Sequence, residues 1–211
     1  MRPFTTPNEF LTNPREGRVS CVPVAQPRIG ADNKSFVLPT CERVQRSCSN
    51  GERTIIEIMQ LLDASLFERM LAQARQSPRR RVNYNFHASM EDNPHRFLNV
   101  MLRGTYITPH RHLDPPKSES FLVLRGELAF FVFNDAGEVT HLQRLGVDPM
   151  GIDIGPGVWH TIAVLSDEAI CFEVKPGPYS AANDKDFAPW APREGNPAAA
   201  AYLAALLEGL H

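Results

Sequence analysis

Three histidines and one glutamate have the types and the spacing of a metal site. His110 and His112 alternate, so both imidazole rings lie on one face if this segment is an extended strand. Glu119 lies in the next apolar segment, and His160 follows a Gly-Pro-Gly turn at residues 155–157. Neutral imidazoles and a carboxylate bind divalent ions such as Fe, Mn, Ni, Co or Zn. The pattern therefore predicts one divalent metal ion between these four side chains.

Asp114 is an alternative to Glu119 as the carboxylate ligand. It continues the alternation of the two histidines. However, Pro115 and Pro116 follow it directly, and two prolines predict that the strand ends there. We therefore favour Glu119, which a longer hairpin loop would bring back beside the histidines.

Short strands must position these residues. Residues 96–175 contain apolar segments of strand length that are separated by turn signals, with no helical pattern between them. The segments are RFLNVML, ESFLVLRGELAFFVF, EVTHLQRL, MGIDIGPG, HTIAVL and AICFEVK. Such a series favours an antiparallel β-barrel or jelly roll. We therefore predict an all-β core.

A short helix is predicted on each side of this core. Asp63 is a suitable N-cap, and apolar residues recur after it at helical spacing until the Ser-Pro pair at residues 77–78. An Asn-Pro pair at residues 196–197 begins a second helix, rich in alanine and leucine, at the C-terminal end. The fold class is therefore an all-β barrel or jelly roll with an N-terminal and a C-terminal helix.

The predicted organisation has three parts. Residues 1–58 form an irregular N-terminal arm, because prolines interrupt any period there. Residues 59–195 form the β domain with its preceding helix, and residues 196–211 form the C-terminal helix. A Pro-rich stretch at residues 176–197 is expected to run over the surface of the domain.

Composition narrows the range of partners and compartments. The formal net charge is -2, with 22 basic and 24 acidic residues, and gives no electrostatic argument for binding nucleic acid or an anionic membrane. A small-molecule partner is expected instead. No secretory signal or membrane-spanning run is recognisable, so a cytoplasmic location is expected. The cysteines lack CxxC spacing and are expected to be free thiols: Cys21, Cys41, Cys48 and Cys171.

The order of the motifs resembles that of the cupin superfamily. Gly104, the two alternating histidines, Glu119 and Gly126 are similar to the first cupin motif, and the Gly-Pro turn with His160 is similar to the second. The loop between His112 and Glu119 is longer than in most cupins. The resemblance implies a cupin jelly roll that holds a metal ion through the three histidines and the glutamate.

Three further segments make the chain similar to the WbuC family of cupin-fold metalloproteins. They are SPRRRVNYNFH, SESFLVLRGELAFFVFNDAGEV and FEVKPGPYSAANDKDFAPWAPREG. The resemblance extends from residue 59 to residue 195. It implies a role in bacterial surface polysaccharide biosynthesis, with a sugar or sugar nucleotide as ligand. Cupins commonly pair through their sheets, so the resemblance also implies a homodimer.

Candidate substrate-binding residues lie on one strand and in the basic segment before it. Asn83, Asn85 and His87 share the polar face of an alternating strand. Inside a barrel they would suit a hydroxyl-rich ligand, whereas on the outer face they would simply be hydrated. Arg81 is a candidate for binding an anionic group, although arginines after a helix also suit its C-terminus as a solvated face.

Four residues are candidates for proton transfer beside the metal. They are His87, Glu173, Lys175 and Tyr179. Glu173 and Lys175 alternate along one strand and are either an acid and a base that line the barrel or an ion pair on its outside. The sequence does not decide between these arrangements.

Several functions agree with such a site. A bound metal that acts as a Lewis acid on a sugar-like compound favours isomerase or epimerase chemistry. With Fe(II) the same ligands would suit a dioxygenase. A non-catalytic module that binds a small ligand through the metal is a further hypothesis, and so is a purely structural barrel.

Overall fold

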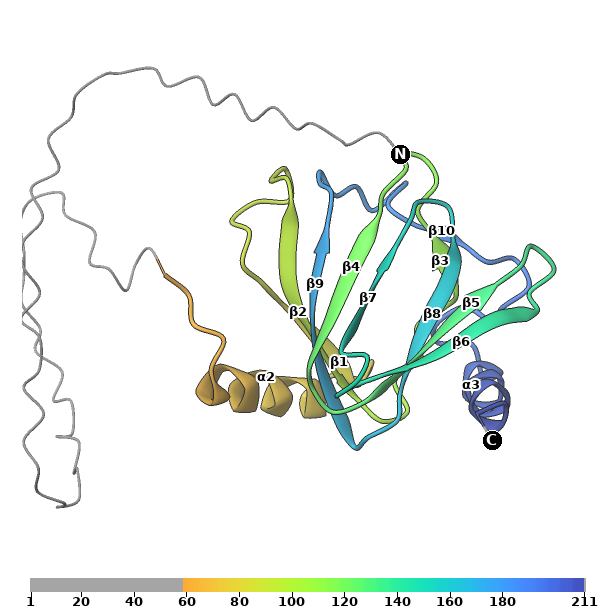
Figure 1. The fold of residues 1–211 in the computed structure, drawn as a ribbon, viewed down its shortest axis with the longest axis horizontal. Coiled ribbons are helices and arrows are strands. Elements are labelled where there is room, and N and C mark those ends of the chain that lie inside the picture. Colours follow the sequence, from red (N-terminus) through yellow and green to blue (C-terminus); the bar gives the residue numbers. More distant parts are fainter. Residues whose placement is uncertain (1–58, 211) are drawn as a thin grey trace, which may run out of the picture. The chain divides into compact units, whose positions relative to one another are not determined.

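The computed structural model describes residues 59–210, and these residues form two facing antiparallel sheets (Figure 1). Each sheet has five strands. In order, the first contains β1 (Arg81–Asn85), β2 (His95–Leu102), β9 (Glu168–Lys175), β4 (Glu119–Arg125) and β7 (Gly151–Ile154). The second contains β10 (Asp186–Phe187), β3 (His110–Arg111), β8 (Trp159–Val164), β5 (Leu128–Phe133) and β6 (Val139–Leu145). The predicted all-β jelly-roll core is therefore confirmed.

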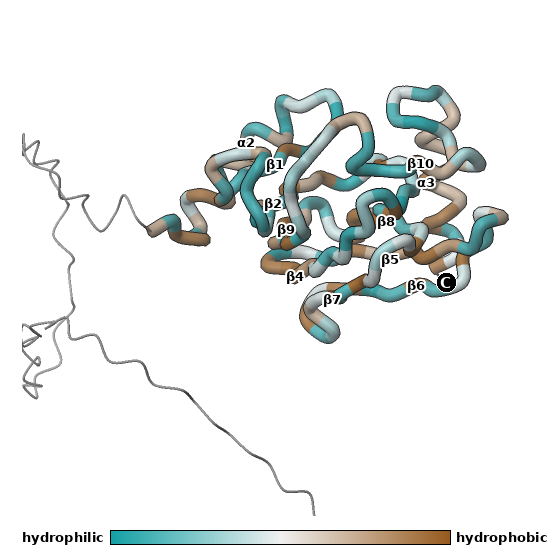
Figure 2. Tube along the Cα trace, turned by 90° about the horizontal axis from the view of Figure 1, so that it is seen from above, coloured by the Kyte–Doolittle hydropathy of each residue, from teal (hydrophilic) through white to brown (hydrophobic). Residues whose placement is uncertain are grey.

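The main core lies between the two sheets and follows from the alternation of each strand. Glu119 and Phe121 of β4 are buried, whereas Ser120 and Leu122 are exposed. Strand β8 differs, because all of its residues are buried. Figure 2 shows the first sheet on one side and β8 and β5 on the other, so inward-facing residues of both sheets meet between them. The strand alternation thus places Glu119 inside the barrel.

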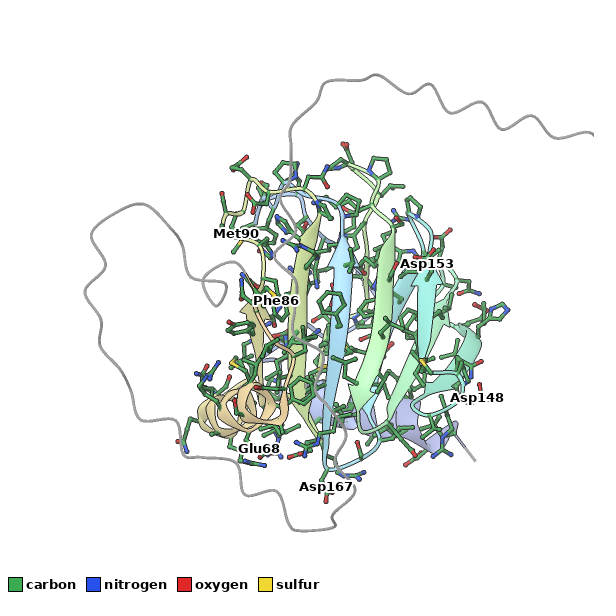
Figure 3. The ribbon with its side chains drawn as sticks, turned by 60° about the vertical axis from the view of Figure 1, so that its left-hand side comes forward. Glu68, Phe86, Met90, Asp148, Asp153 and Asp167 are labelled. Carbon is green, nitrogen blue, oxygen red and sulfur yellow. The ribbon has the colours of Figure 1, made fainter. Side chains whose placement is uncertain are left out.

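Helix α2 (Ala64–Gln76) packs on the outer face of the first sheet. Its N-terminus is capped as predicted, since the Asp63 carboxylate accepts a hydrogen bond of 2.8 Å from the backbone N–H of Leu66. Leu71 and Ala74 are completely buried in a cluster with residues of β2 and β9. In Figure 3 the helix crosses one end of this sheet, on the side of Glu68 and Asp167. The opposite end, near Met90, is left to loops.

Helix α3 (Ala199–Glu208) lies against the second sheet. Leu203 is buried in a cluster with Trp159 and Phe131, which explains why the outer face of β8 is apolar as well. The helix begins just after the Asn-Pro pair at residues 196–197, which forms a turn: the side chain of Asn196 accepts from the backbone N–H of Ala198, and its carbonyl accepts from that of Ala199. Within residues 59–210, no helix is both long and apolar enough to cross a membrane.

The segment of residues 176–197, here called the tail segment, does more than run over the surface. Strand β10 within it pairs with β3, so that Phe187 lies opposite His110. Asp184 and Ala188 are buried, with exposed fractions of 4% and 1%. The prediction of a surface stretch is therefore wrong for the middle of the tail segment, because a short strand and a buried aspartate fasten it to the barrel.

Two predictions concern residues that are not described. The arm of residues 1–58 and the cysteines at positions 21, 41 and 48 lie outside the described part of the chain. Cys171 is described and is a buried free thiol, as predicted. Burial raises the pKa of this thiol well above its usual value, so it is an unreactive core residue.

The glycine that ends β4 provides a test of the fold. Gly126 has φ +77°, and a Cβ atom there would overlap the carbonyl oxygen of Glu168. Gly195 has a similar φ of +82° but open space around it. We expect Gly195→Ala to lower the free energy of unfolding by ~1–2 kcal/mol through backbone strain alone. Gly126→Ala should cost a further ~1–3 kcal/mol through overpacking. Urea unfolding measures both, and equal losses would contradict this packing of the turn.

Candidate metal centre and its cavity

The structure brings the four predicted ligands together inside the barrel. His110 on β3 lies opposite His160 on β8, and His112 follows β3 directly. Glu119 reaches them from the first residue of β4, in the opposite sheet. One ligand atom from each residue lies within 4.8 Å of the others, and all four residues are buried. The cluster therefore joins the two sheets at one point.

Hydrogen bonds to backbone carbonyls fix the proton on each imidazole. Nδ1 of His110 donates to the carbonyl of Thr108 at 3.0 Å, and Nδ1 of His160 donates to the carbonyl of Val158 at 2.9 Å. Nδ1 of His112 donates to the carbonyl of Asp184. A carbonyl can only accept, so the proton of each neutral ring is on Nδ1 and the lone pair is on Nε2. All three rings thus offer an Nε2 lone pair as a ligand.

The carboxylate of Glu119 meets two of these lone pairs. Nε2 of His112 lies 3.0 Å from Oε1, and Nε2 of His160 lies 3.1 Å from Oε2. Yet Nε2 of His112 and Oε2 of Glu119 are buried without a hydrogen-bond partner. Two acceptors at this distance repel each other unless a positive charge lies between them. The arrangement fits a divalent cation, which would accept electron pairs from all four residues.

The protonation states agree with this arrangement. Burial raises the pKa of Glu119, but the positive charge that its contacts with His112 and His160 require, together with the charge of Lys175, outweighs burial and holds the pKa well below its usual value. Burial lowers the pKa of His110 well below its usual value, helped by the charge of Lys185. The glutamate is therefore ionised and His110 is neutral, the forms in which they bind metal.

A second layer of charged residues surrounds the glutamate. Nζ of Lys175 lies 3.4 Å from Oε1 of Glu119 and donates to Asp184 at 3.2 Å. Nζ of Lys117 donates to the other carboxylate oxygen of Asp184 at 2.8 Å. Burial lowers the pKa of Lys175, but the charges of Glu173, Glu119 and Asp184 reverse the effect and raise it above its usual value. Asp184 thus contacts both ammonium groups through its carboxylate and His112 through its backbone carbonyl.

Glu173 lies inside the barrel next to this layer, so the predicted arrangement of Glu173 and Lys175 on the outside does not hold. Its Oε2 accepts a hydrogen bond of 3.4 Å from the amide of Asn99, and its Oε1 lies 3.9 Å from Nζ of Lys175. Burial and the charge of Glu119 raise the pKa of Glu173 to about 8. A group with this pKa can hold or release a proton near neutral pH.

A cavity of about 710 Å³ leads toward the ligands. A smaller chamber of about 30 Å³ lies beside His110, Glu119 and His160. Four residues line both spaces and therefore stand where the two meet: Asn99, Ile107, Glu173 and Lys185. Met90, which Figure 3 labels on the loop after β1, also lines the larger cavity. The lining of this cavity thus extends from Gln73 and Ser77 at α2 to Met90 on the loop.

The polar face of β1 lines this cavity, whereas its apolar face packs under α2. Asn83, Asn85 and His87 are lining residues, and Nε2 of His87 is buried without a hydrogen-bond partner. The ring of His87 stacks on His95 at 4.1 Å between ring centres. Tyr179, which is 41% exposed, also belongs to the wall. His87 is buried, whereas Asn83 and Asn85 are exposed, so this face borders an open part of the cavity and is not enclosed in the barrel.

The arginines before β1 are already paired. The guanidinium group of Arg81 donates to Glu194, to the hydroxyl of Thr105 at 3.1 Å and to the carbonyl of Tyr106 at 2.9 Å. Arg79 pairs with the same glutamate at 3.0 Å. Both arginines line the cavity, but their charge is shared with Glu194. The Arg81 guanidinium thus has little left to offer a ligand.

Sequence patterns missed three charged residues of the site and offered one alternative that lies elsewhere. Lys117, Asp184 and Lys185 lie in loops, where no periodicity indicates which side chains point inward. Burial and the charge of Lys175 lower the pKa of Lys185. Asp114 is exposed and is not part of the cluster, so the alternative to Glu119 is not supported.

Comparisons with known proteins give a partial family match and distant structural likenesses. The family described as a "Domain of unknown function (DUF6016)" matches residues 62–145, from before α2 to the end of β6. A comparison with curated proteins finds no match. Because the matching description is a different one, the WbuC resemblance stays a prediction.

The chain is also similar to parts of several solved structures. It is 21% identical to the capsular polysaccharide assembling protein CapF from Staphylococcus aureus, with a TM-score of 0.43, over 50% of this chain and 28% of that chain. It is 15% identical to L-ribose isomerase from Cellulomonas parahominis, with a TM-score of 0.42, over 53% and 70% of the two chains. It is 20% identical to NovW, a 4-keto-6-deoxy sugar epimerase from Streptomyces spheroides, with a TM-score of 0.37, over 44% and 49%. The chain thus spans less than a third of CapF, and likenesses of this size do not assign a function.

Proposed function

We propose that this chain is a metal-dependent isomerase or epimerase that acts on a small, hydroxylated, sugar-like compound. The observation that carries the proposal is the convergence of three Nε2 lone pairs and one buried carboxylate beside a cavity whose wall holds Glu173. A divalent ion bound there would polarise a carbonyl or hydroxyl oxygen of the substrate. The resemblance to the WbuC family supports a sugar-linked substrate from surface polysaccharide biosynthesis.

The residues of the cavity have different roles in such a reaction. Glu173 is the residue that moves a proton, because its pKa of about 8 lets it act in both directions near neutral pH. The amide of Asn99 holds the carboxyl group of Glu173 in place. Asn83 and Asn85 offer donors and acceptors to substrate hydroxyl groups along the wall. Lys175 keeps Glu119 ionised and is thus a positioning residue.

The metal ligands can be tested by elemental analysis of protein purified without a histidine tag. We expect about one equivalent of a divalent transition metal in the wild type. His160→Ala and His112→Ala should lose most of it, because each removes one of four ligands. His141→Ala is the matched control, since His141 is exposed on β6 and outside the cluster. Full occupancy in His160→Ala would remove this residue from the ligand set.

Asp184 tests whether the tail segment supports the site. Its carbonyl accepts from His112, and its carboxylate binds Lys117 and Lys175. Asp184→Ala keeps the carbonyl but removes the carboxylate that fixes it through Lys117 and Lys175. We expect the loosened carbonyl to orient His112 less well and metal binding to weaken by about tenfold, the lower end of the effect of losing an outer partner of a ligand. Asp186→Ala is the control, because Asp186 is exposed and pairs only with Arg111 at the surface. Competition with a chelator measures both, and equal affinities would contradict the supporting role.

Glu173→Gln separates catalysis from binding. Glutamine keeps the shape and the neutral state of the side chain but cannot exchange a proton. We expect the metal-loaded wild type to catalyse exchange of sugar C–H protons for deuterium in D₂O, followed by NMR across a panel of aldoses and ketoses. The variant should lose about 10²- to 10⁴-fold in rate with unchanged metal content. Binding of sugars by the wild type without any exchange would favour a non-catalytic binding module.

A further inference from the structure

Lys185 occupies a distinct place in the cavity wall. It lines the large cavity and also the small chamber beside His110, Glu119 and His160. The other two lysines of the site are both paired, since Lys117 and Lys175 donate to Asp184. Among residues 59–210, the ammonium group of Lys185 has no carboxylate within 4.0 Å and no hydrogen-bond partner. It is therefore a positive group that is available to a ligand.

The backbone on both sides holds Lys185 in this position. The preceding residue, Asp184, is fixed by two ammonium groups and by His112. The following strand, β10, pairs with β3 so that Phe187 lies opposite His110. Because the lysine lies between these two anchors, its side chain starts from a fixed point close to the metal ligands. Such preorganisation lowers the entropic cost of holding a ligand.

The charges around the ligand cluster are unbalanced. With a divalent ion in place, the ion and the three lysines carry five positive charges. The carboxylates of Glu119, Asp184 and Glu173 carry at most three negative charges. The pairs of Arg79 and Arg81 with Glu194 add no negative excess. A buried excess of positive charge is costly unless an anion enters to compensate it.

We propose that Lys185 binds an acidic group, a carboxylate or a phosphate, of a substrate whose hydroxylated part reaches the metal ligands. This inference rests on the proposed metal site and narrows its substrate to sugar acids or sugar phosphates. The acidic group supplies the missing negative charge, and the lysine donates to it through charge-assisted hydrogen bonds. Asn83 and Asn85 in the cavity wall then face the remaining hydroxyl groups of the substrate.

Three six-carbon probes test the inference on the full-length, metal-loaded protein. Sorbitol, gluconate and sorbitol 6-phosphate share a linear polyol skeleton but carry no acid group, a carboxylate and a phosphate, respectively. Isothermal titration calorimetry gives their affinities. We expect the wild type to bind gluconate or sorbitol 6-phosphate at least about tenfold more tightly than sorbitol, and the better of the two identifies the acid group. Lys185→Met should lose about 10- to 100-fold for that probe.

Two controls separate a specific contact from a general loss of charge. Lys185→Arg keeps the positive charge and should keep the preference for an acid group. Arg79→Met removes a charge from the same cavity, but one that is already paired with Glu194, and should change the affinity little. Melting temperatures and elemental analysis of each variant show that fold and metal are retained. The inference is wrong if sorbitol binds as well as its acidic analogues, if no probe binds, or if Lys185→Met leaves the affinities unchanged.

Metal content distinguishes this inference from the proposed function. A wild-type chain without metal would overturn the proposed function. In that case Lys185→Met and the wild type are compared as metal-free proteins. If both bind the acidic probes equally well, the inference is overturned as well. Metal at full occupancy with no preference for acidic probes overturns the inference alone.

Discussion

The buried carboxylate of Glu119 is the constraint on which the surrounding structure depends. A negative charge with an exposed fraction of 2% is costly inside a β-barrel unless partners compensate it. Its two oxygens face the unprotonated Nε2 atoms of His112 and His160, whose Nδ1–H groups donate to backbone carbonyls. Among the described residues, Lys175 has the only ammonium group within 4.0 Å of it. These partners come from both sheets and from the residue after β3, and the tail segment holds two of them, His112 and Lys175, through Asp184. The site is thus the point where three parts of the fold meet.

The paired lysines show how a barrel core can hold so many charges. Asp184 receives both Lys117 and Lys175, so none of these three charges is left unpaired in the interior. The free-energy cost of burying Glu173 is lowered in a different way, because a pKa of about 8 keeps its carboxyl group protonated and uncharged at neutral pH. Lys185 is the exception, and it lies where the cavity reaches the ligands. Lys117, Lys175 and Asp184 are thus paired with one another, whereas the unpaired Lys185 borders the space for a ligand.

The sequence predicted those parts of the site that depend on local geometry. Alternation placed His110 and His112 on one face, and the strand pattern placed Glu119 and His160 at the starts of β4 and β8. It also predicted Asp63 as the cap of α2. These features depend on residues close in the chain, where the period of a strand or helix decides direction.

Long-range contacts were beyond such reasoning. Lys117 and Asp184 meet across 67 positions of the sequence, and neither lies in a strand whose alternation would indicate its direction. Strand β10 has only two residues, too few for a pattern to be recognised. Its existence depends on β3, which pairs with it, and not on its own composition. For the same reason the tail segment resembled a surface stretch in the sequence.

The position of the tail segment in the chain also sets the order in which the site can be completed. All four ligands have been synthesised once His160 emerges from the ribosome, but the carbonyl that orients His112 belongs to Asp184, and the strand that pairs with β3 follows it. A nascent chain that ends before residue 184 therefore carries every ligand and lacks the support of two of them. We therefore expect the proposed metal binding to be tight only in the finished domain.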